Sequence, residues 1–376
     1  MASPDSHPLI SVIVPAYNVG EKLEETLRSL AGQGPKDDSR FEFLIVDDGS
    51  RDNTLEVAKA FAATDPRFKV LHQRNRGCGP ARNTGLDAAT GDWVGFLDGD
   101  DILMPGTLDK VLKLGEDSDV NWIFGSYAEF TDHRDGAPAP TTPEGLETRI
   151  PEMPPTGTRM RAFDWMKDAI DRHHWVHYCW IQFARRSWVE AHHFRFPPRN
   201  VFHQDIFWTA DLAAENPIMV FSRDIFVAYR VWSASTSNSK KPRVGKRQGY
   251  SYMHIIRSIV RLANRLRPEH PDVADALIRH AEFETRHFYG ILHHRAVPAD
   301  RKLMAKVWCP EYTPALFWQG LPKTGSGIWF AAKAERLIEI IRFMSAAIRI
   351  TQCQIVSASE IKTAVAMSAS GRSLIA

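Results

Sequence analysis

One segment of the sequence, residues 91–101, joins an apolar run directly to a cluster of acidic side chains. Residues 93–97 have the composition and length of a buried strand, and Asp98, Asp100 and Asp101 follow at once. Three carboxylates so close together repel one another, so this turn is stable only if a cation or several hydrogen-bond donors neutralise it. Gly99 allows the tight turn that brings its neighbours together. The segment therefore predicts the end of a strand at a site for a metal-bound, phosphorylated small molecule.

Short apolar runs alternate with helix-length amphipathic stretches from residue 9 to about residue 127. This alternation is typical of an α/β fold, in which helices cover a mostly parallel sheet. We expect helices at residues 21–30 and from the turn at residues 50–54 onwards. We expect strands at residues 10–14, 41–46, 68–71, 93–97 and 120–127.

The character of the sequence changes along the second half of the chain. Residues 132–158 are rich in Pro, Gly and Thr, which predicts a loop or irregular strand. Residues 163–212 are rich in Trp, Tyr and His, and helical spacing of apolar residues dominates from about residue 250. We therefore expect an α/β region over residues 1–240 and a helical region over residues 241–376.

Bulk composition excludes several classes of protein. The 376 residues are 44% hydrophobic and 24% charged, which is ordinary for a globular protein, and the net charge of +2 predicts no nucleic-acid partner. The four cysteines show no Cys-x-x-Cys spacing, so neither a zinc knuckle nor a disulfide framework is indicated. The start of the chain lacks the pattern of a secretory signal, and no apolar run reaches about 18 residues. These features predict a cytoplasmic protein without a transmembrane helix.

Polar turns follow three of the expected parallel strands, at residues 15–18, 47–50 and 98–101. Ligands of open α/β sheets bind at the carboxyl ends of the strands, so we expect all three turns to face one site. Taken alone, Asp47 and Asp48 fit equally well as charges at the N-terminus of a helix.

A glycine-bearing loop at residues 75–83 precedes a predicted helix. Loop amides and a helix N-terminus suit an anionic group, to which Arg76 or Arg82 would add charge. The alternative is a permissive turn with Arg82 on a solvated helix face. The loop lacks the P-loop and dinucleotide spacings, so neither an ATPase nor a dinucleotide enzyme is indicated.

The segments SVIVPAYN (11–18), VDDGSRD (46–52), residues 77–85 and FLDGDD (96–101) resemble successive blocks of one family, in order and spacing. They resemble the family 2 inverting glycosyltransferases with the GT-A fold, of the kind that assemble bacterial surface glycans. A fainter resemblance extends the match to about residue 238. Together these resemblances imply a GT-A domain over residues 1–240, with an acceptor-side part from about residue 150, and a helical C-terminal region over residues 241–376.

The resemblance also implies roles for particular side chains. A nucleotide-sugar donor, most often a UDP-sugar, would lie in the crevice at the strand ends, with Arg82 near its anionic groups. Asp98 would touch the ribose, Asp100 would hold Mg²⁺ or Mn²⁺ on the diphosphate, and Asp205 would be the catalytic base. Hard oxygen ligands and a diphosphate leaving group agree with such an ion. The base and ribose would be surrounded by Pro15, Ala16, Tyr17 and Asp48.

The sequence departs from the family pattern beside Asp205, because Gln204 stands where the family has Glu. Loss of a neighbouring carboxylate removes a like charge, so we expect Asp205 to ionise more readily. Considered alone, Asp205 also fits as a helix N-cap before residues 206–208. Gln204 leaves a non-catalytic, glycan-binding relative as an alternative.

We expect transfer of a single sugar to a glycan or lipid-linked acceptor in bacterial polysaccharide assembly. The alternative enzyme class is a sugar nucleotidyltransferase, which would carry a Gly-rich, basic segment after its first strand. The chain has Pro-Ala-Tyr-Asn there, which disfavours this alternative. The oligomeric state stays open.

Other features of the later sequence allow more than one interpretation. His173 and His177 have the spacing of metal ligands on a helix, but no His-Glu-x-x-His motif accompanies them. Most aromatics of residues 163–212 should be core, with one or two left to stack on acceptor sugars. The basic run 240–247 is expected to be a loop, either solvated, closing over a diphosphate or touching anionic lipid. The basic amphipathic helix expected at residues 330–350 would pack on protein or lie on the inner face of the membrane.

Overall fold

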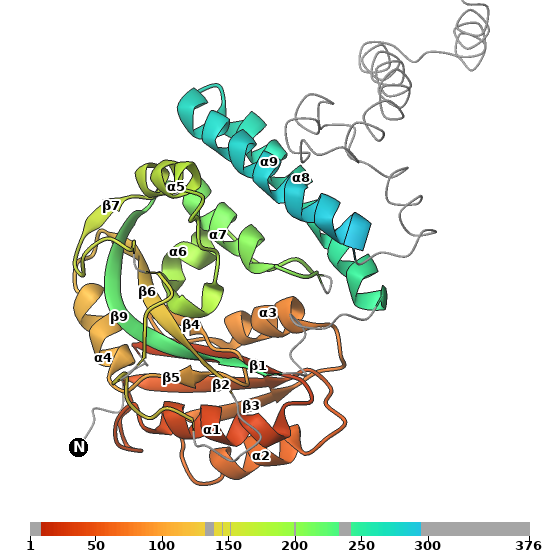
Figure 1. Ribbon diagram of the computed structural model, residues 1–376. Coiled ribbons are helices and arrows are strands. Elements are labelled where there is room, and N and C mark those ends of the chain that lie inside the picture. The colour runs from red at the N-terminus through yellow and green to blue at the C-terminus, as the bar shows by residue number, and fades with distance from the viewer. Residues whose placement is uncertain are drawn as a thin grey trace, which may run out of the picture.

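The computed structural model describes residues 9–131, 139–144, 146–150, 152–198, 201–232 and 242–294. Strands and helices alternate regularly up to β4, and the pattern is less regular afterwards (Figure 1). In chain order the elements are β1 (Ile10–Ala16), α1 (Gly20–Ala31), β2 (Phe41–Asp47), α2 (Thr54–Ala62), β3 (Phe68–His72), α3 (Cys78–Ala88), β4 (Trp93–Phe96), β5 (Ile102–Leu103), α4 (Thr107–Leu114), β6 (Val120–Thr131), β7 (Arg159–Arg161), α5 (Ala162–Asp171), the 3₁₀ helix η1 (Cys179–Ile181), β8 (Gln182–Arg185), α6 (Arg186–Ala191), α7 (Asp205–Ala214), β9 (Ile218–Val231), α8 (Pro242–Leu266) and α9 (Pro271–His294).

The strands form one mixed sheet with the order β3-β2-β1-β4-β8-β6-β9-β5, and β7 pairs with β9. The first four strands are parallel, whereas β8 is antiparallel to both β4 and β6. The pair β6 and β9 is again parallel. The predicted α/β class and all five predicted strands are confirmed, as are both predicted helix positions.

Helices cover both faces of the parallel part of the sheet (Figure 1). The helices α1 and α2 lie on one face, and α3 lies on the other. Because they are covered on both sides, β1 and β2 are buried along their whole length, which explains their near-continuous apolar sequences.

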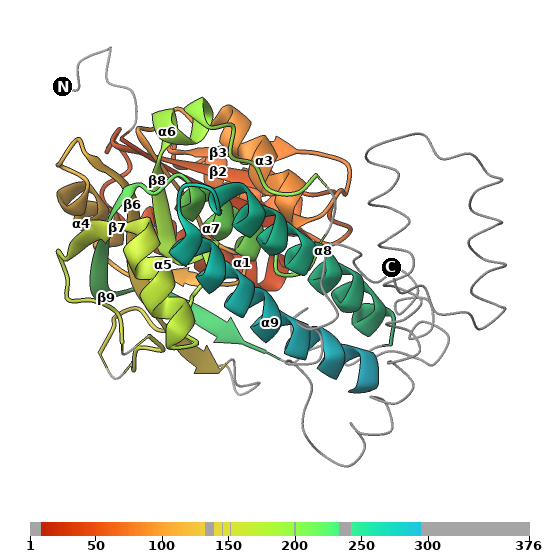
Figure 2. The ribbon, with the colours of Figure 1, turned by 90° about the horizontal axis from the view of Figure 1, so that it is seen from above.

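A hairpin of two long helices, α8 and α9, lies side by side over α5 and α7 (Figure 2). The predicted basic loop at 240–247 is wrong from Pro242 onwards, because this residue begins α8. Proline suits the first position of a helix, where its missing N–H group has no helical partner. The predicted helix at residues 330–350, with its membrane contact, lies outside the described residues. Within the described ranges, no helix combines the length and apolar composition that crossing a bilayer requires.

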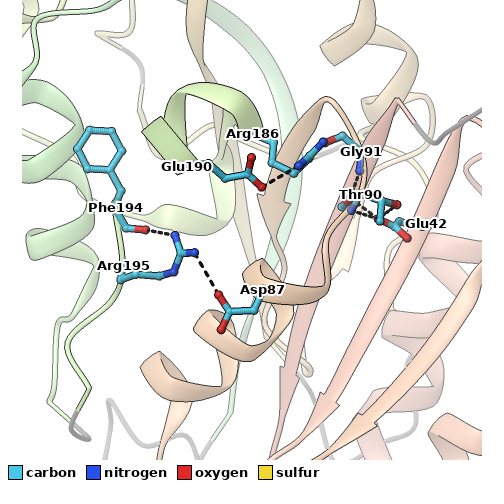
Figure 3. Close-up of polar contacts among 9 residues, drawn as sticks. Glu42, Asp87, Thr90, Gly91, Arg186, Glu190, Phe194 and Arg195 are labelled. Atoms are coloured by element: carbon cyan, nitrogen blue, oxygen red, sulfur yellow. Dashed lines mark hydrogen bonds and ion pairs between the residues drawn. The ribbon is translucent and has the colours of Figure 1, made fainter. Parts of the chain in front are cut away.

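Polar contacts attach the second half of the chain to the start of β4 (Figure 3). The Arg186 guanidinium donates to the Gly91 carbonyl at 2.7 Å and pairs with Glu190 on its own helix, α6. Arg195 pairs with Asp87 at the end of α3 at 3.1 Å. These contacts lie at the amino end of β4, so they hold the halves together at the edge opposite the acidic turn.

Candidate active site

The carboxyl ends of β1, β2 and β4 meet at one edge of the sheet. In the parallel register Ala16 lies beside Asp47, and Ile13 lies beside Phe96. The three polar turns therefore face one site, as predicted. They open on a cavity of about 1650 Å³. Its lining includes the eight residues to which the family resemblance assigns a role, but not Asp47, Arg76 or Asp101: Pro15, Ala16, Tyr17, Asp48, Arg82, Asp98, Asp100 and Asp205.

Asp48 holds the glycine-bearing loop in place where the strand ends border the cavity. Its carboxylate accepts hydrogen bonds from the Gln73 amide at 2.7 Å and from the backbone N–H groups of Arg76 at 2.9 Å and Gly77 at 2.7 Å. Asp48 is 2% exposed. Asp48 does not lie at the start of α2, which begins only at Thr54, but its partner Gly77 is the N-cap residue of α3. The carboxylate therefore both borders the cavity and lies at the N-terminus of a helix.

The turns after β1 and β2 are locked to each other. Asn18 adopts a left-handed backbone with φ 53°, and its side chain accepts from the Arg51 N–H while its own N–H donates to Ser50. Gly49 has φ 71°, and a side chain there would meet the backbone of Asn75. Asp52 accepts from the N–H groups at the starts of both α1 and α2. This network leaves the neighbouring Tyr17 ring 43% exposed on the cavity.

Arg82 forms a buried bridge between two acids that are far apart in the sequence. Its guanidinium lies 2.6 Å from the Asp98 carboxylate at the end of β4 and 3.2 Å from that of Asp205 at the start of α7. Its side chain is 3% exposed and packs against the rings of Phe96 and Phe196. The alternative of a solvated Arg82 is therefore wrong, although the residue does line the cavity.

Asp205 is the first residue of α7, and its side chain turns to Arg82 instead of capping the helix. Burial raises the pKa of Asp205 above its usual value, while the Arg82 charge opposes this shift. This direction differs from the expectation of easy ionisation that Gln204 alone suggested. Cys179, at the start of η1, also lowers the pKa of Asp205. The arrangement presents a carboxylate that is oriented on one oxygen and more basic than a free aspartate.

Donors from the end of β9 hold the acidic turn after β4. The Trp232 indole N–H donates to Asp100 at 2.9 Å, and the Arg230 backbone N–H donates to Asp101 at 2.9 Å. The Arg230 guanidinium donates to the Asp100 carbonyl at 2.7 Å and pairs with Glu25. Of the two ways to neutralise this turn, the structure provides hydrogen-bond donors from the protein itself.

The surroundings of the acidic turn are unfavourable for negative charge. Burial raises the pKa of Asp100, and the neighbouring Asp98 charge raises it further. Burial also raises the pKa of Asp101 well above the usual value, with added repulsion from Asp100. No group of three potential ligand side chains converges within the described part of the chain. Such a site fits Mg²⁺ or Mn²⁺ held by one carboxylate together with substrate phosphate and water.

The far end of the cavity is aromatic. As predicted, most of the aromatics of residues 163–212 are core: Trp165, Trp175, Trp180 and Trp208 are each at most 7% exposed. Tyr178 differs, because it is 40% exposed on the cavity. The helix that a paired His173 and His177 metal site would need ends at Asp171.

His177 instead connects the aromatic end to the helical hairpin. Its Nε2 lies 3.2 Å from Nε2 of His280 on α9, and its carbonyl accepts from Thr209 on α7 at 3.0 Å. Burial lowers the pKa of His177 well below its usual value, so its ring is neutral.

Several residues of the cavity were not anticipated. Trp232 lies within the stretch, up to about residue 238, that resembles the family more faintly, so its position was a signal for it. Tyr178, Glu129 and Arg149 also line the cavity, but nothing in their local sequence distinguishes them from other surface residues.

The chain is similar to known glycosyltransferases. The sequence profile described as glycosyl transferase family 2 matches residues 11–208. The uncharacterized glycosyltransferase YibD of Escherichia coli (strain K12) is 27% identical over 300 residues, which cover 78% of this chain and 79% of YibD. The poly(ribitol-phosphate) beta-N-acetylglucosaminyltransferase TarP of Staphylococcus aureus (strain N315) is 38% identical over 120 residues, which cover 31% of this chain and 36% of TarP.

A solved structure has the same fold. The crystal structure of S. aureus TarS 1-349 in complex with UDP-GlcNAc aligns with a TM-score of 0.52 over 93% of both chains, at 18% identity. The family match covers more than half of the chain and sets aside the nucleotidyltransferase alternative. The chain therefore belongs to glycosyl transferase family 2 and has the GT-A fold.

Proposed function

We propose that this protein is a metal-dependent, inverting glycosyltransferase that moves one sugar from a nucleotide-diphosphate donor to a hydroxyl group of a glycan or lipid-linked acceptor. One observation carries the proposal. The acidic turn and Asp205, on opposite sides of the Arg82 guanidinium, line one cavity with Tyr17 and Asp48. Catalysis is assigned to residues 1–240, and the helices beyond them support the acceptor side.

The donor is assigned to the end of the cavity formed by the three strand-end turns. The exposed ring of Tyr17 offers a face for the base, and Asp48 and Asp98 lie beside it for the ribose. A UDP-sugar is favoured, because the TarS structures with TM-scores of 0.52 and 0.50 are complexes with UDP-GlcNAc and UDP. The name of TarP supports an acceptor among bacterial cell-surface polymers.

Asp100 is the residue assigned to hold Mg²⁺ or Mn²⁺. Its Oδ2 accepts from Trp232, which leaves Oδ1 for the ion. A bound ion would stabilise the charge that develops on the departing diphosphate. The raised pKa of Asp100, caused by burial and by the charge of Asp98, supports this role because a cation relieves both effects.

Asp205 is assigned as the base. It takes the proton from the acceptor hydroxyl while the oxygen attacks the anomeric carbon opposite the diphosphate. The new carbon–oxygen bond forms as the bond to the diphosphate breaks, which inverts the configuration. Arg82 holds Oδ1 of Asp205, so the carboxylate is oriented before the acceptor arrives.

A screen of nucleotide sugars tests the assignment. We expect wild-type protein to bind one of them in a Mn²⁺-dependent manner and to hydrolyse it slowly. Asp100→Ala should lose the Mn²⁺ dependence of binding. Asp205→Asn should bind the donor but transfer its sugar about 10²–10⁴-fold more slowly.

The matched control is Asp87→Asn, an exposed aspartate at the far end of α3 that pairs with Arg195. It should leave donor binding and transfer unchanged. Donor binding by Asp100→Ala with wild-type Mn²⁺ dependence contradicts the metal assignment. Absence of binding to any nucleotide sugar in the wild type contradicts the donor, and would instead favour a non-catalytic relative.

A further inference from the structure

Two large aromatic side chains stand out as exposed among the described residues, and both line the same cavity. They are Tyr17, which is 43% exposed, and Tyr178, which is 40% exposed. Tyr17 lies at the donor end, between the turns after β1 and β2. Tyr178 lies in the segment between α5 and η1, and the proposed reaction has not yet used it.

Tyr178 is the outer layer of a stack of three rings. Its ring centroid lies 5.1 Å from that of Trp180 with an interplanar angle of 17°, and Trp180 lies 5.5 Å from Tyr229 at 11°. Trp180 is covered on both faces and is only 4% exposed. Trp180 stacks on one face of Tyr178, and Tyr178 is nevertheless 40% exposed and lines the cavity. The outer end of the stack therefore borders the cavity.

The open ring is held rigidly. The Tyr127 ring lies against it, with the ring centroids 5.2 Å apart and an interplanar angle of 78°. The preceding residue, His177, is fixed by Thr209 on α7 and by His280 on α9. A ring fixed in this way loses little conformational entropy when a ligand packs on it.

The surroundings of the ring suit a sugar better than a lipid chain. The ion pair of Glu129 and Arg149, at 2.8 Å, lines the same cavity, and its side chains are 33% and 53% exposed. His174 pairs with Glu152 on the same wall at 2.8 Å. Carboxylate and guanidinium groups around an aromatic face match the hydroxyl rim and the apolar C–H face of a pyranose ring. A lipid chain would cover these charged groups without offering them any further hydrogen bond.

The position of Tyr178 relative to Asp205 favours the acceptor over the donor. Tyr178 directly precedes η1, which packs against α7, the helix that begins at Asp205. A sugar on this ring therefore lies near the proposed base, whereas the nucleotide end of the cavity is formed by β1, β2 and their turns.

We propose that Tyr178 is the acceptor platform of this enzyme and that the acceptor presents a pyranose ring whose apolar face stacks on it. The inference rests on the proposed function, because it assigns Asp205 to the acceptor hydroxyl. It adds a specificity-determining residue and a chemical class: a neutral sugar ring at the acceptor end.

Saturation-transfer NMR tests the platform with methyl β-glycosides of glucose, galactose and N-acetylglucosamine as probes, each at about 10 mM, with a parallel titration of UDP and Mg²⁺. In the wild type we expect saturation concentrated on the ring protons of one sugar face. Tyr178→Ala should lower the affinity for the bound glycoside about tenfold or more, and Tyr178→Phe should keep most of it.

Tyr17→Ala is the matched control, because it removes the other exposed ring of the same cavity. It should weaken UDP binding and leave the glycoside signal intact, whereas Tyr178→Ala should do the reverse. Wild-type glycoside signals in Tyr178→Ala would overturn the platform, as would no glycoside signal in wild-type protein that binds UDP. Loss of UDP binding in the wild type would instead count against the proposed UDP donor.

Discussion

The two ends of the cavity use different physical interactions. At the donor end every carboxylate meets hydrogen-bond donors or a cation, as Asp48 does with Gln73 and two backbone amides. At the far end rings pack on rings, as in the stack that ends at Tyr178. Hydrogen bonds to charged groups dominate the donor end, and ring packing dominates the aromatic end. The donor end should therefore respond strongly to pH and charge substitutions, and the aromatic end mainly to loss of surface.

The largest expected effect lies at the charged end, in the pH dependence of transfer. Asp205 must be ionised to accept a proton, and burial raises its pKa while Arg82 opposes the rise. We expect kcat/KM to be flat at high pH and to fall tenfold per pH unit below the pKa of Asp205. Tyr178→Phe should keep this profile, because the aromatic end carries no titrating group in the reaction. An acid limb that persists unchanged in the residual activity of Asp205→Asn would exclude Asp205 as its origin.

The next effect concerns Arg82, whose guanidinium pairs with both Asp98 and Asp205. Arg82→Leu leaves Asp98 and Asp205 without their buried partner, so we expect the free energy of unfolding to fall by about 3–5 kcal/mol. Lower pH should recover part of this loss, because the acids can then be neutralised by protons. Urea denaturation at two pH values measures both quantities.

Arg195→Leu is the control for the bridge, since it breaks an exposed ion pair with Asp87. Its cost should stay below about 1 kcal/mol. Equal costs for the two variants would mean that the buried bridge contributes nothing beyond an ordinary surface pair.

A smaller effect is expected for Trp232, the aromatic side chain that donates a hydrogen bond to the acidic turn. Trp232→Phe keeps the ring but removes the N–H donor to Asp100. Because such outer partners orient metal ligands, we expect about a tenfold weaker Mn²⁺ affinity in the presence of UDP, measured by calorimetry. Trp188→Phe, on α6 and outside the cavity lining, should leave this affinity unchanged. Identical Mn²⁺ affinities in both variants would remove Trp232 from the metal site.

The last effect, and the one least connected with the site, concerns Asp211, a buried acid that does not line the cavity. Burial raises the pKa of Asp211 on α7 to about 6, with Arg265 opposing the rise and Glu215 adding to it. Its ionisation therefore costs stability above pH 6, and this cost disappears below the usual value of 3.8. Asp211→Asn should raise the free energy of unfolding by about 1–3 kcal/mol at pH 8 and leave it unchanged at pH 4. A gain at pH 4 as large as that at pH 8 would disprove this origin.

The donor end could be predicted because its residues are encoded next to the strands that position them. Asp48 and Asp98 follow β2 and β4 directly, and parallel register alone brings strand ends together. The same reasoning could not give the partner of Arg82, since Asp205 is 123 positions away, at the start of α7. A local pattern contains no information about such a distant contact.

The aromatic end was much less accessible to prediction. Its segment contains many rings, and only tertiary packing decides that Trp180 is enclosed while Tyr178 faces the cavity. The basic run was misassigned for a related reason. Its charges suggested a solvated loop, whereas Pro242 starts a helix whose apolar side packs on α9.

The end of β9 contributes to both ends of the cavity through adjacent residues. Side chains alternate between the two faces of a strand, so Tyr229 supports the aromatic stack while Arg230 binds the acidic turn. An insertion or deletion of one residue here would exchange these positions and disable both ends at once. Sequence drift along this lineage should therefore tolerate changes of length in the segment before Tyr178, where acceptor preference can diverge, but not in the last residues of β9.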